Sequence, residues 1–195
     1  MQEGQDAYHG VRVNRLQVAD AQAVVAAGPV GGPTADRLRS SVVEVVKAVR
    51  APLAPRFIRS VVTAATEVPE VAARLPLAGW SVTIRVSGDR ELHRLNRDFL
   101  GEDEPTDVLS FPSGDAEASG YLGDIVISWP AVLRQAAAFT HTPEVEAALL
   151  CVHGLLHLLG WDHAAREAEK EMNRLTFLAL EKVRADVPIG RLNDG

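Results

Sequence analysis

The β-strand signal is clearest at Ser81-Val82-Thr83-Ile84-Arg85-Val86-Ser87. Apolar and polar residues alternate there with a period of two, and β-branched side chains are frequent, which predicts a β-strand. Two short apolar runs further along, 108–111 and 125–127, are bounded by turn residues and predict buried strands. The polar, glycine-containing segment 112–120 between them predicts a mobile loop.

Helical patterns lie on both sides of these strands. In the earliest, Val42, Val45 and Val49 recur at helical spacing, and proline opens two of the later ones, where it is tolerated in the first turn. The segments that predict helices are 36–50, 56–66, 90–99, 130–139, 143–159 and 164–184. Strands and helices are mixed without a regular βαβ rhythm, which predicts an α+β fold with a small mixed sheet packed against helices.

The length of 195 residues and the 47% hydrophobic content predict a single compact domain. Residues 28–33 are rich in glycine and proline and are typical of a linker, and residues 11–16 alternate only weakly, as in an edge strand. We therefore expect a flexible extension over residues 1–35 and one domain over 36–195.

Several features favour a cytoplasmic protein. Cys151 is the only cysteine, so no disulfide can form within the chain. The polar, acidic N-terminus is unlike a secretory signal, and no apolar run reaches the roughly 18–20 residues of a membrane span.

The net charge of −6 argues against indiscriminate binding of polyanions, although a local basic face remains compatible with nucleic acid.

The chemistry-bearing residues are concentrated in Val152-His153-Gly154-Leu155-Leu156-His157-Leu158-Leu159-Gly160-Trp161-Asp162-His163. His153 and His157 are four residues apart on a predicted helix, so they project from one face and can bind the same ion. Gly160 allows a sharp turn that can return His163 to that ion. Three nitrogen ligands with an open position are typical of catalytic zinc, and one zinc ion per chain is predicted.

Gly154 distinguishes this motif from that of the common zinc proteases. In the H-E-x-x-H motif a glutamate at that position serves as general base for the zinc-bound water. Its absence disfavours peptide hydrolysis by that route. Phosphodiester cleavage fits better, because a Lewis acid can bind a phosphoryl oxygen while nearby cations neutralise developing charge.

Three motifs together resemble those of a known family. The histidine motif at 153–163 is preceded by Pro-Thr-Asp-Val-Leu-Ser-Phe-Pro at 105–112 and by Gly-Asp-Ile at 123–125. In this order they resemble the bacterial YbeY family of rRNA maturation factors, over roughly residues 81–180. The resemblance implies a stripped-down metalloprotease (zincin-like) fold with zinc on His153, His157 and His163.

The same resemblance implies the activity and the partners. The expected activity is single-strand-specific endoribonuclease cleavage in the maturation of ribosomal RNA, especially at the small-subunit 3′ end, and in ribosome quality control. The expected partners are single-stranded and ribosomal RNA and the small ribosomal subunit, without a membrane or a nucleotide cofactor.

Leu100 departs from the family pattern, because many members carry an arginine at that position. Arg97, one helical turn earlier, is the candidate catalytic substitute, with Arg94 and Arg85 as alternatives. Asp162 is a candidate to orient a ligand histidine, and a plain turn role competes with it.

Two other functions remain open from the sequence. One is a metalloprotease-like hydrolase with an unidentified base. The other is a non-catalytic RNA-binding ribosome assembly factor with structural zinc.

Overall fold

A mixed four-stranded sheet forms the centre of the protein. The computed structural model describes residues 41–162, 165–183 and 185. The strand order is β1-β2-β4-β3, in which neighbours pair in parallel except for the antiparallel pair of β3 and β4. The strands are β1 (Val42–Lys47), β2 (Ser81–Ser87), β3 (Val108–Pro112) and β4 (Tyr121–Ser128). The predicted α+β class with a mixed sheet is confirmed.

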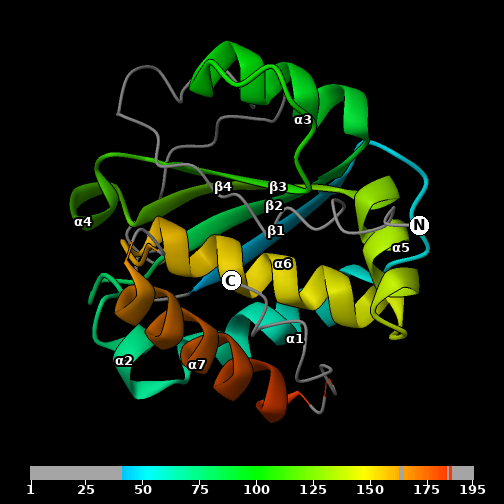
Figure 1. Ribbon diagram of the computed structural model, residues 1–195. Coiled ribbons are helices and arrows are strands. Elements are labelled where there is room, and N and C mark those ends of the chain that lie inside the picture. Colours follow the sequence, from blue (N-terminus) through cyan, green and yellow to red (C-terminus); the bar gives the residue numbers. More distant parts are fainter. Residues whose placement is uncertain (1–40, 163–164, 184, 186–195) are drawn as a thin grey trace, which may run out of the picture.

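Helices cover both faces of this sheet. Those of the described ranges are α1 (Pro55–Thr66), α2 (Pro69–Ala72), α3 (Asp89–Leu95), the π-helical turn η3 (Asn96–Leu100), α4 (Ala116–Ser119), α5 (Trp129–Ala138), α6 (Pro143–Leu158) and α7 (Arg166–Lys182). Helices α1, α6 and α7 lie on one face and α3 on the other (Figure 1). None of these helices is long and apolar enough to cross a membrane.

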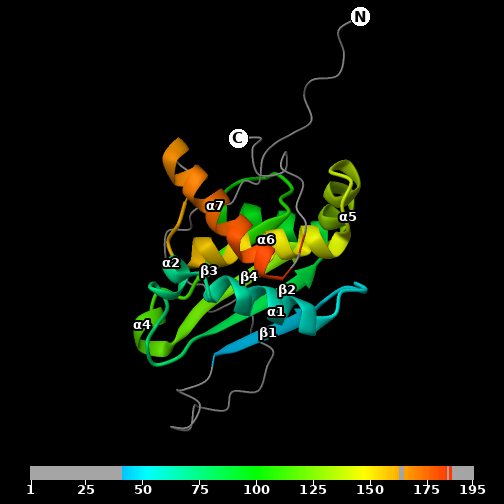
Figure 2. The same ribbon diagram turned by 90° about the horizontal axis from the view of Figure 1, so that it is seen from below.

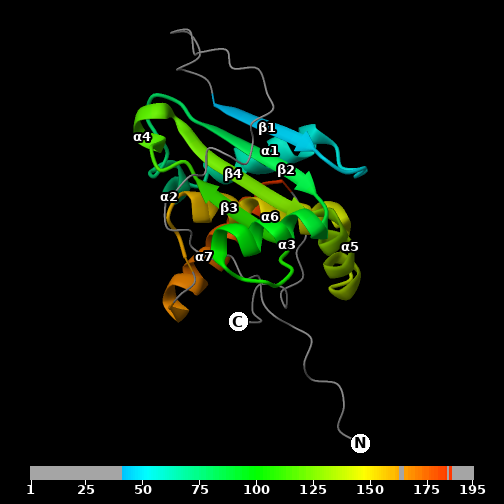
Figure 3. The ribbon, with the colours of Figure 1, turned by 90° about the horizontal axis from the view of Figure 1, so that it is seen from above.

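The alternation of side chains along the strands divides the core in two. Ile125 and Ile127 of β4 face the larger cluster, which also contains the buried side of α1, α6 and α7 (Figure 2). Val126, between them, faces a smaller cluster with Leu92 and Leu95 of α3, on the face seen from above (Figure 3). The sheet therefore separates α6 from α3 and η3.

The helix predicted over 36–50 is wrong. Residues 36–40 lie outside the described part, and Val42–Lys47 forms the edge strand β1. This strand pairs in parallel with β2, in a register that sets Val43 opposite Val82 and Val45 opposite Ile84. Valines spaced three and four apart fit a helix, but the same β-branched side chains also fit a strand, and pairing along the whole of β2 favours the strand.

The other predicted elements are largely confirmed. Helices α1, α5, α6 and α7 match their predictions within two residues at each described end, and the helix over 90–99 continues into η3. The run at 125–127 belongs to a longer strand that begins at Tyr121. The loop predicted over 112–120 contains the short helix α4.

The predicted extension over 1–35, its edge strand and its linker lie outside the described residues, so the proposed division of the chain stays a prediction.

Candidate metal centre

Helix α6 carries two of the three predicted ligands. It begins at Pro143 after Thr142, whose side-chain oxygen accepts a hydrogen bond from the backbone N–H of Val145 at 3.4 Å. Most of its residues, from Glu146 to Leu156, are buried, because sheet and helices enclose it on several sides. A helix that is apolar nearly all round is expected in such a position. The core therefore fixes the position of this helix.

At Gly154, α6 packs tightly against the sheet. A Cβ atom at this position would lie 2.7 Å from Cγ2 of Ile125 and 3.1 Å from Oγ of Ser110. The Ser110 hydroxyl also donates a hydrogen bond to the carbonyl oxygen of Gly154 at 3.1 Å. Residue 154 thus faces strands β3 and β4, and the glutamate of a zinc protease has no room there. The sequence showed the missing base but not this packing reason for it.

His153 and His157 meet on one side of α6. Their Nε2 atoms are 3.3 Å apart, and their rings are arranged edge to face with centroids 4.9 Å apart. His153 is buried, with 6% of its surface exposed, whereas His157 is half-buried. The structure therefore brings these two candidate ligands together, with one of them held within the core.

The separation of the two nitrogens fits a shared zinc ion. Two nitrogen–zinc bonds of about 2.0–2.1 Å at a tetrahedral angle place the nitrogens about 3.3–3.4 Å apart. The Nε2 atoms of His153 and His157 are 3.3 Å apart. Both are imidazole nitrogens, which are favoured zinc ligands. The pair of His153 and His157 is therefore compatible with a shared zinc ion, both in the distance between the nitrogens and in the type of donor atom.

The chain leaves α6 through a tight turn directed by Gly160. This glycine adopts a φ of 84°, in the left-handed region. Its N–H donates to the carbonyl of His157 at 3.0 Å, and the N–H of Trp161 donates to that of Leu156 at 3.0 Å. These two bonds are the Schellman arrangement that ends many helices. The predicted sharp exit after α6 is confirmed.

His163, the third predicted ligand, lies outside the described residues. Within the described ranges no group of three or more His, Cys, Asp or Glu side chains is placed to hold a metal ion. Asp162, which directly precedes His163, is half-buried. The ligand role of His163 and the orienting role of Asp162 stay predictions.

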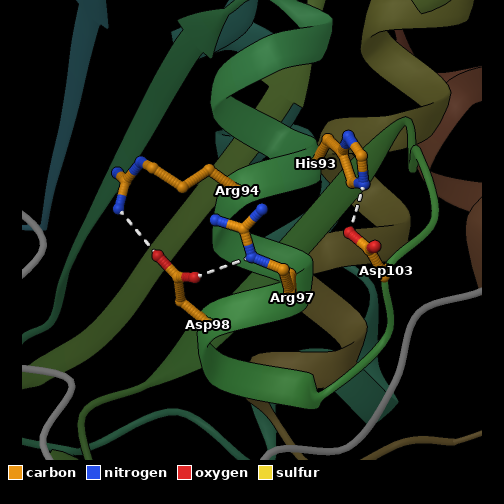
Figure 4. A network of polar contacts seen from close by, with 5 residues as sticks. All are labelled: His93, Arg94, Arg97, Asp98 and Asp103. Atoms are coloured by element: carbon orange, nitrogen blue, oxygen red, sulfur yellow. Dashed lines mark hydrogen bonds and ion pairs between the residues drawn. The ribbon is translucent and has the colours of Figure 1, made fainter.

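Arg97 lies on η3, on the face of the sheet opposite to α6 and its histidine pair (Figure 4). Its Nε donates to Oδ1 of Asp98 at 3.2 Å, and Arg94 donates to Oδ2 of the same carboxylate at 3.3 Å. Arg85, the remaining candidate, pairs with Glu91 at 3.1 Å. No hydrogen bond or ion pair among the described residues joins Arg97 to the histidine pair. Its catalytic role stays a prediction.

The side chain of Leu100 is partly buried against the smaller hydrophobic cluster. A leucine therefore has an apolar environment where many family members have arginine. Nearby, Asn96 is buried and donates a hydrogen bond from Nδ2 to the carbonyl of Glu104 at 2.8 Å. This bond ties the loop after η3 back to the π-helical turn.

Asp124, from the Gly-Asp-Ile motif at 123–125, is a buried carboxyl group. It lies within β4 and is 4% exposed, and its Oδ1 atom has no hydrogen-bond partner among the described residues. Burial raises the pKa of Asp124, and the Tyr121 hydroxyl opposes that shift. The apolar run at 125–127 gave no signal that the strand starts earlier.

Fold and site together define an α+β protein that carries an H-x3-H histidine pair on a central, buried helix. Residues 47–184 match the family described as Endoribonuclease YbeY. The chain belongs to the YbeY family.

Relatives with the name Endoribonuclease YbeY are similar over most of their length. That of Chloroflexus aurantiacus is 46% identical over 141 residues, which cover 62% of this chain and 92% of the relative. That of Chloroflexus aggregans is 48% identical over 136 residues, which cover 65% and 82%. The solution structure of TM1509 from Thermotoga maritima aligns at 23% identity with a TM-score of 0.49, over 77% of this chain and 98% of that chain.

Proposed function

We propose that this protein is a zinc-dependent endoribonuclease that cuts single-stranded RNA. The 3.3 Å separation of Nε2 in His153 and Nε2 in His157 is the observation that carries the metal part of the proposal. Membership of the YbeY family, whose description names an endoribonuclease, supports the choice of RNA as substrate. His163 is the proposed third ligand, and one ion is bound per chain.

The chain's own residues prepare the site before the substrate arrives. Burial of His153 and the close contact at Gly154 restrict the position and orientation of the imidazole pair. Such preorganisation lowers the reorganisation that catalysis would otherwise require. When bound, zinc supplies Lewis acidity toward a phosphoryl oxygen.

The biological role that we propose is maturation of ribosomal RNA, especially at the 3′ end of the small-subunit RNA, and ribosome quality control. The partners would then be single-stranded ribosomal RNA and the small ribosomal subunit, in the cytoplasm. The resemblance of the three motifs to those of the YbeY family supports this role.

A metalloprotease is the less favoured alternative. Its usual base would stand at residue 154, where a side chain meets Ile125 and Ser110. The second alternative is an RNA-binding assembly factor without catalysis. The observation on its side is Leu100, which stands where many family members have arginine and lies in an apolar environment. Both alternatives predict outcomes different from those of the nuclease in the following experiment.

The test compares wild type, His157→Ala and the control His93→Ala. His93 is a surface histidine that pairs with Asp103 at 2.9 Å on α3, so its removal also deletes one imidazole but leaves α6 intact. Zinc per chain is measured by elemental analysis, and folding is checked by circular dichroism. We expect about one zinc in wild type and His93→Ala, and a large loss in His157→Ala.

The same three proteins are incubated with one RNA sequence, as a single strand and as a duplex. We expect the two zinc-containing proteins to cut the single strand only, and folded His157→Ala to cut neither. Unchanged zinc in His157→Ala would refute the metal site. RNA binding without cleavage by wild type would support the assembly factor, and zinc-dependent digestion of casein would support the protease.

A further inference from the structure

Arg74 reaches the turn that ends α6 from a distant part of the chain. It follows α2, 85 residues before its hydrogen-bond partner Leu159. Its Nη1 donates to the carbonyl oxygen of Leu159 at 3.0 Å. Its guanidinium carbon lies 3.6 Å from the ring centroid of Trp161. One side chain therefore contacts the residues on both sides of Gly160.

Both contacts suit the chemistry of a guanidinium group. The Leu159 carbonyl lies at the C-terminus of a helix, where carbonyl oxygens lack intrahelical donors and a cation is favoured by the helix dipole. Trp161 is buried, and its ring offers a flat π face on which a planar arginine stacks. The hydrogen bond uses the Nη1 atom of the guanidinium group, and the cation–π contact uses its face. The two contacts can therefore form together, and they restrict the turn more than either would alone.

The turn is bonded to the end of α6 that carries His157. The N–H of Gly160 donates to the carbonyl of His157, and the N–H of Trp161 donates to the carbonyl of Leu156, each at 3.0 Å. We propose that Arg74 is a positioning residue for the metal centre, which holds the turn at 159–161 and so restrains the last turn of α6, from which His157 projects. This inference rests on the proposed zinc site.

The physical reason is entropic. A ligand on a loosely held segment must lose conformational freedom when the ion binds, and that loss lowers the affinity. Groups that orient metal ligands without touching the ion typically contribute 10–100-fold to affinity. Since Arg74 acts from the surface and through the backbone, we expect the lower end, roughly a ten-fold weaker zinc affinity in Arg74→Ala.

Arg174 offers a matched control. It also joins α2 to another helix, because it bonds Glu70 of α2 at 2.8 Å and Glu171 of α7 at 2.7 Å. None of its hydrogen bonds or ion pairs within the described residues reaches the turn at 159–161. Arg174→Ala thus removes an arginine and a contact of α2 but leaves the Leu159 and Trp161 contacts of Arg74 in place.

The experiment measures the zinc dissociation constant of the full chain by competition with a coloured chelator. Wild type, Arg74→Ala, Arg74→Lys and Arg174→Ala are compared. We expect roughly ten-fold weaker binding in Arg74→Ala, and partial recovery in Arg74→Lys, which keeps the charge but stacks less well on Trp161. Arg174→Ala should bind zinc within two-fold of wild type.

Hydrogen exchange of the metal-free proteins measures the turn itself. The amides of Gly160 and Trp161 should exchange faster in Arg74→Ala than in wild type, and at an unchanged rate in Arg174→Ala. Zinc binding by wild type together with an unchanged dissociation constant in Arg74→Ala would overturn the role of Arg74 and leave the proposed function intact. A wild type that binds no zinc would overturn the proposed metal centre and, with it, this role.

An equal loss of affinity in Arg74→Ala and Arg174→Ala would also overturn the proposal, because it would assign the effect to the attachment of α2 in general.

Discussion

Replacement of Gly154 by alanine is expected to destabilise the protein, although alanine is the better helix former. Alanine in place of an interior helical glycine normally contributes about 1 kcal/mol of stability. Here its Cβ would lie 2.7 Å from Cγ2 of Ile125, which is a rigid branch of a fully buried side chain. Overpacking costs about 1–3 kcal/mol, and a contact as short as 2.7 Å belongs in the upper half of that range, about 2–3 kcal/mol. After the helix-propensity gain is subtracted, we expect a net loss of about 1–2 kcal/mol.

Urea denaturation measures this loss. With an m-value of about 1–3 kcal/mol/M, the midpoint of Gly154→Ala should fall by roughly 0.5–1 M while m itself stays unchanged. The contact with Ile125 is isolated by a double-mutant cycle. In an Ile125→Ala background the 2.7 Å contact is gone and the 3.1 Å approach to Oγ of Ser110 remains, so Gly154→Ala should cost much less stability there than in wild type. A single variant that is as stable as wild type, or a loss of the same size in the Ile125→Ala background, would refute the packing argument.

Three further outcomes follow from buried positions. Gly123→Ala should be strongly destabilised in urea titrations, because its φ of 135° is in the left-handed region and a Cβ would lie 2.1 Å from the carbonyl oxygen of Phe111. Because burial raises the pKa of Asp124, the folded state keeps a proton that the unfolded chain has released, and the free energy of unfolding should fall as pH rises above about 4. The Asp124→Asn variant should show a smaller fall between pH 4 and 7, and a fall equal to that of wild type would contradict this role of Asp124. Burial raises the pKa of the Cys151 thiol to about 12, so a thiol reagent at pH 8 should label the chain only after unfolding, and rapid labelling of the native protein would contradict the buried position.

Local patterns were sufficient where one type of structure was clearly favoured. The alternation at Ser81–Ser87 and the proline starts of α5 and α6 correctly predicted a strand and two helices. The valines at 42–47 misled because their spacing fits two periods. Only the pairing partner β2, some forty residues later, selects the strand, and no local rule contains that information.

The candidate site divides in the same way. The spacing of His153 and His157 was enough to predict that they share a helix face, since i and i+4 side chains are neighbours on any helix. The contact of Arg74 with Trp161 had no signal in the sequence, because it joins residues far apart that meet only in the folded chain. The role of Gly154 was half visible: the absent glutamate was evident, but the strands that exclude it were not.

The close contact of Gly154 with Ile125 bears on two features of the histidine motif, which are the missing protease glutamate and the fixed positions of His153 and His157. The close approach of Gly154 to Ile125 brings α6 against the sheet, and the same approach fixes the helix turn from which His153 projects. A larger residue at 154 would move α6 outward and shift the two imidazoles relative to the rest of the fold. The glycine that removes the protease base is therefore also the residue that keeps the pair in place. The general base of the proposed nuclease must therefore come from a residue other than 154, because that position faces strands β3 and β4 in the interior of the protein.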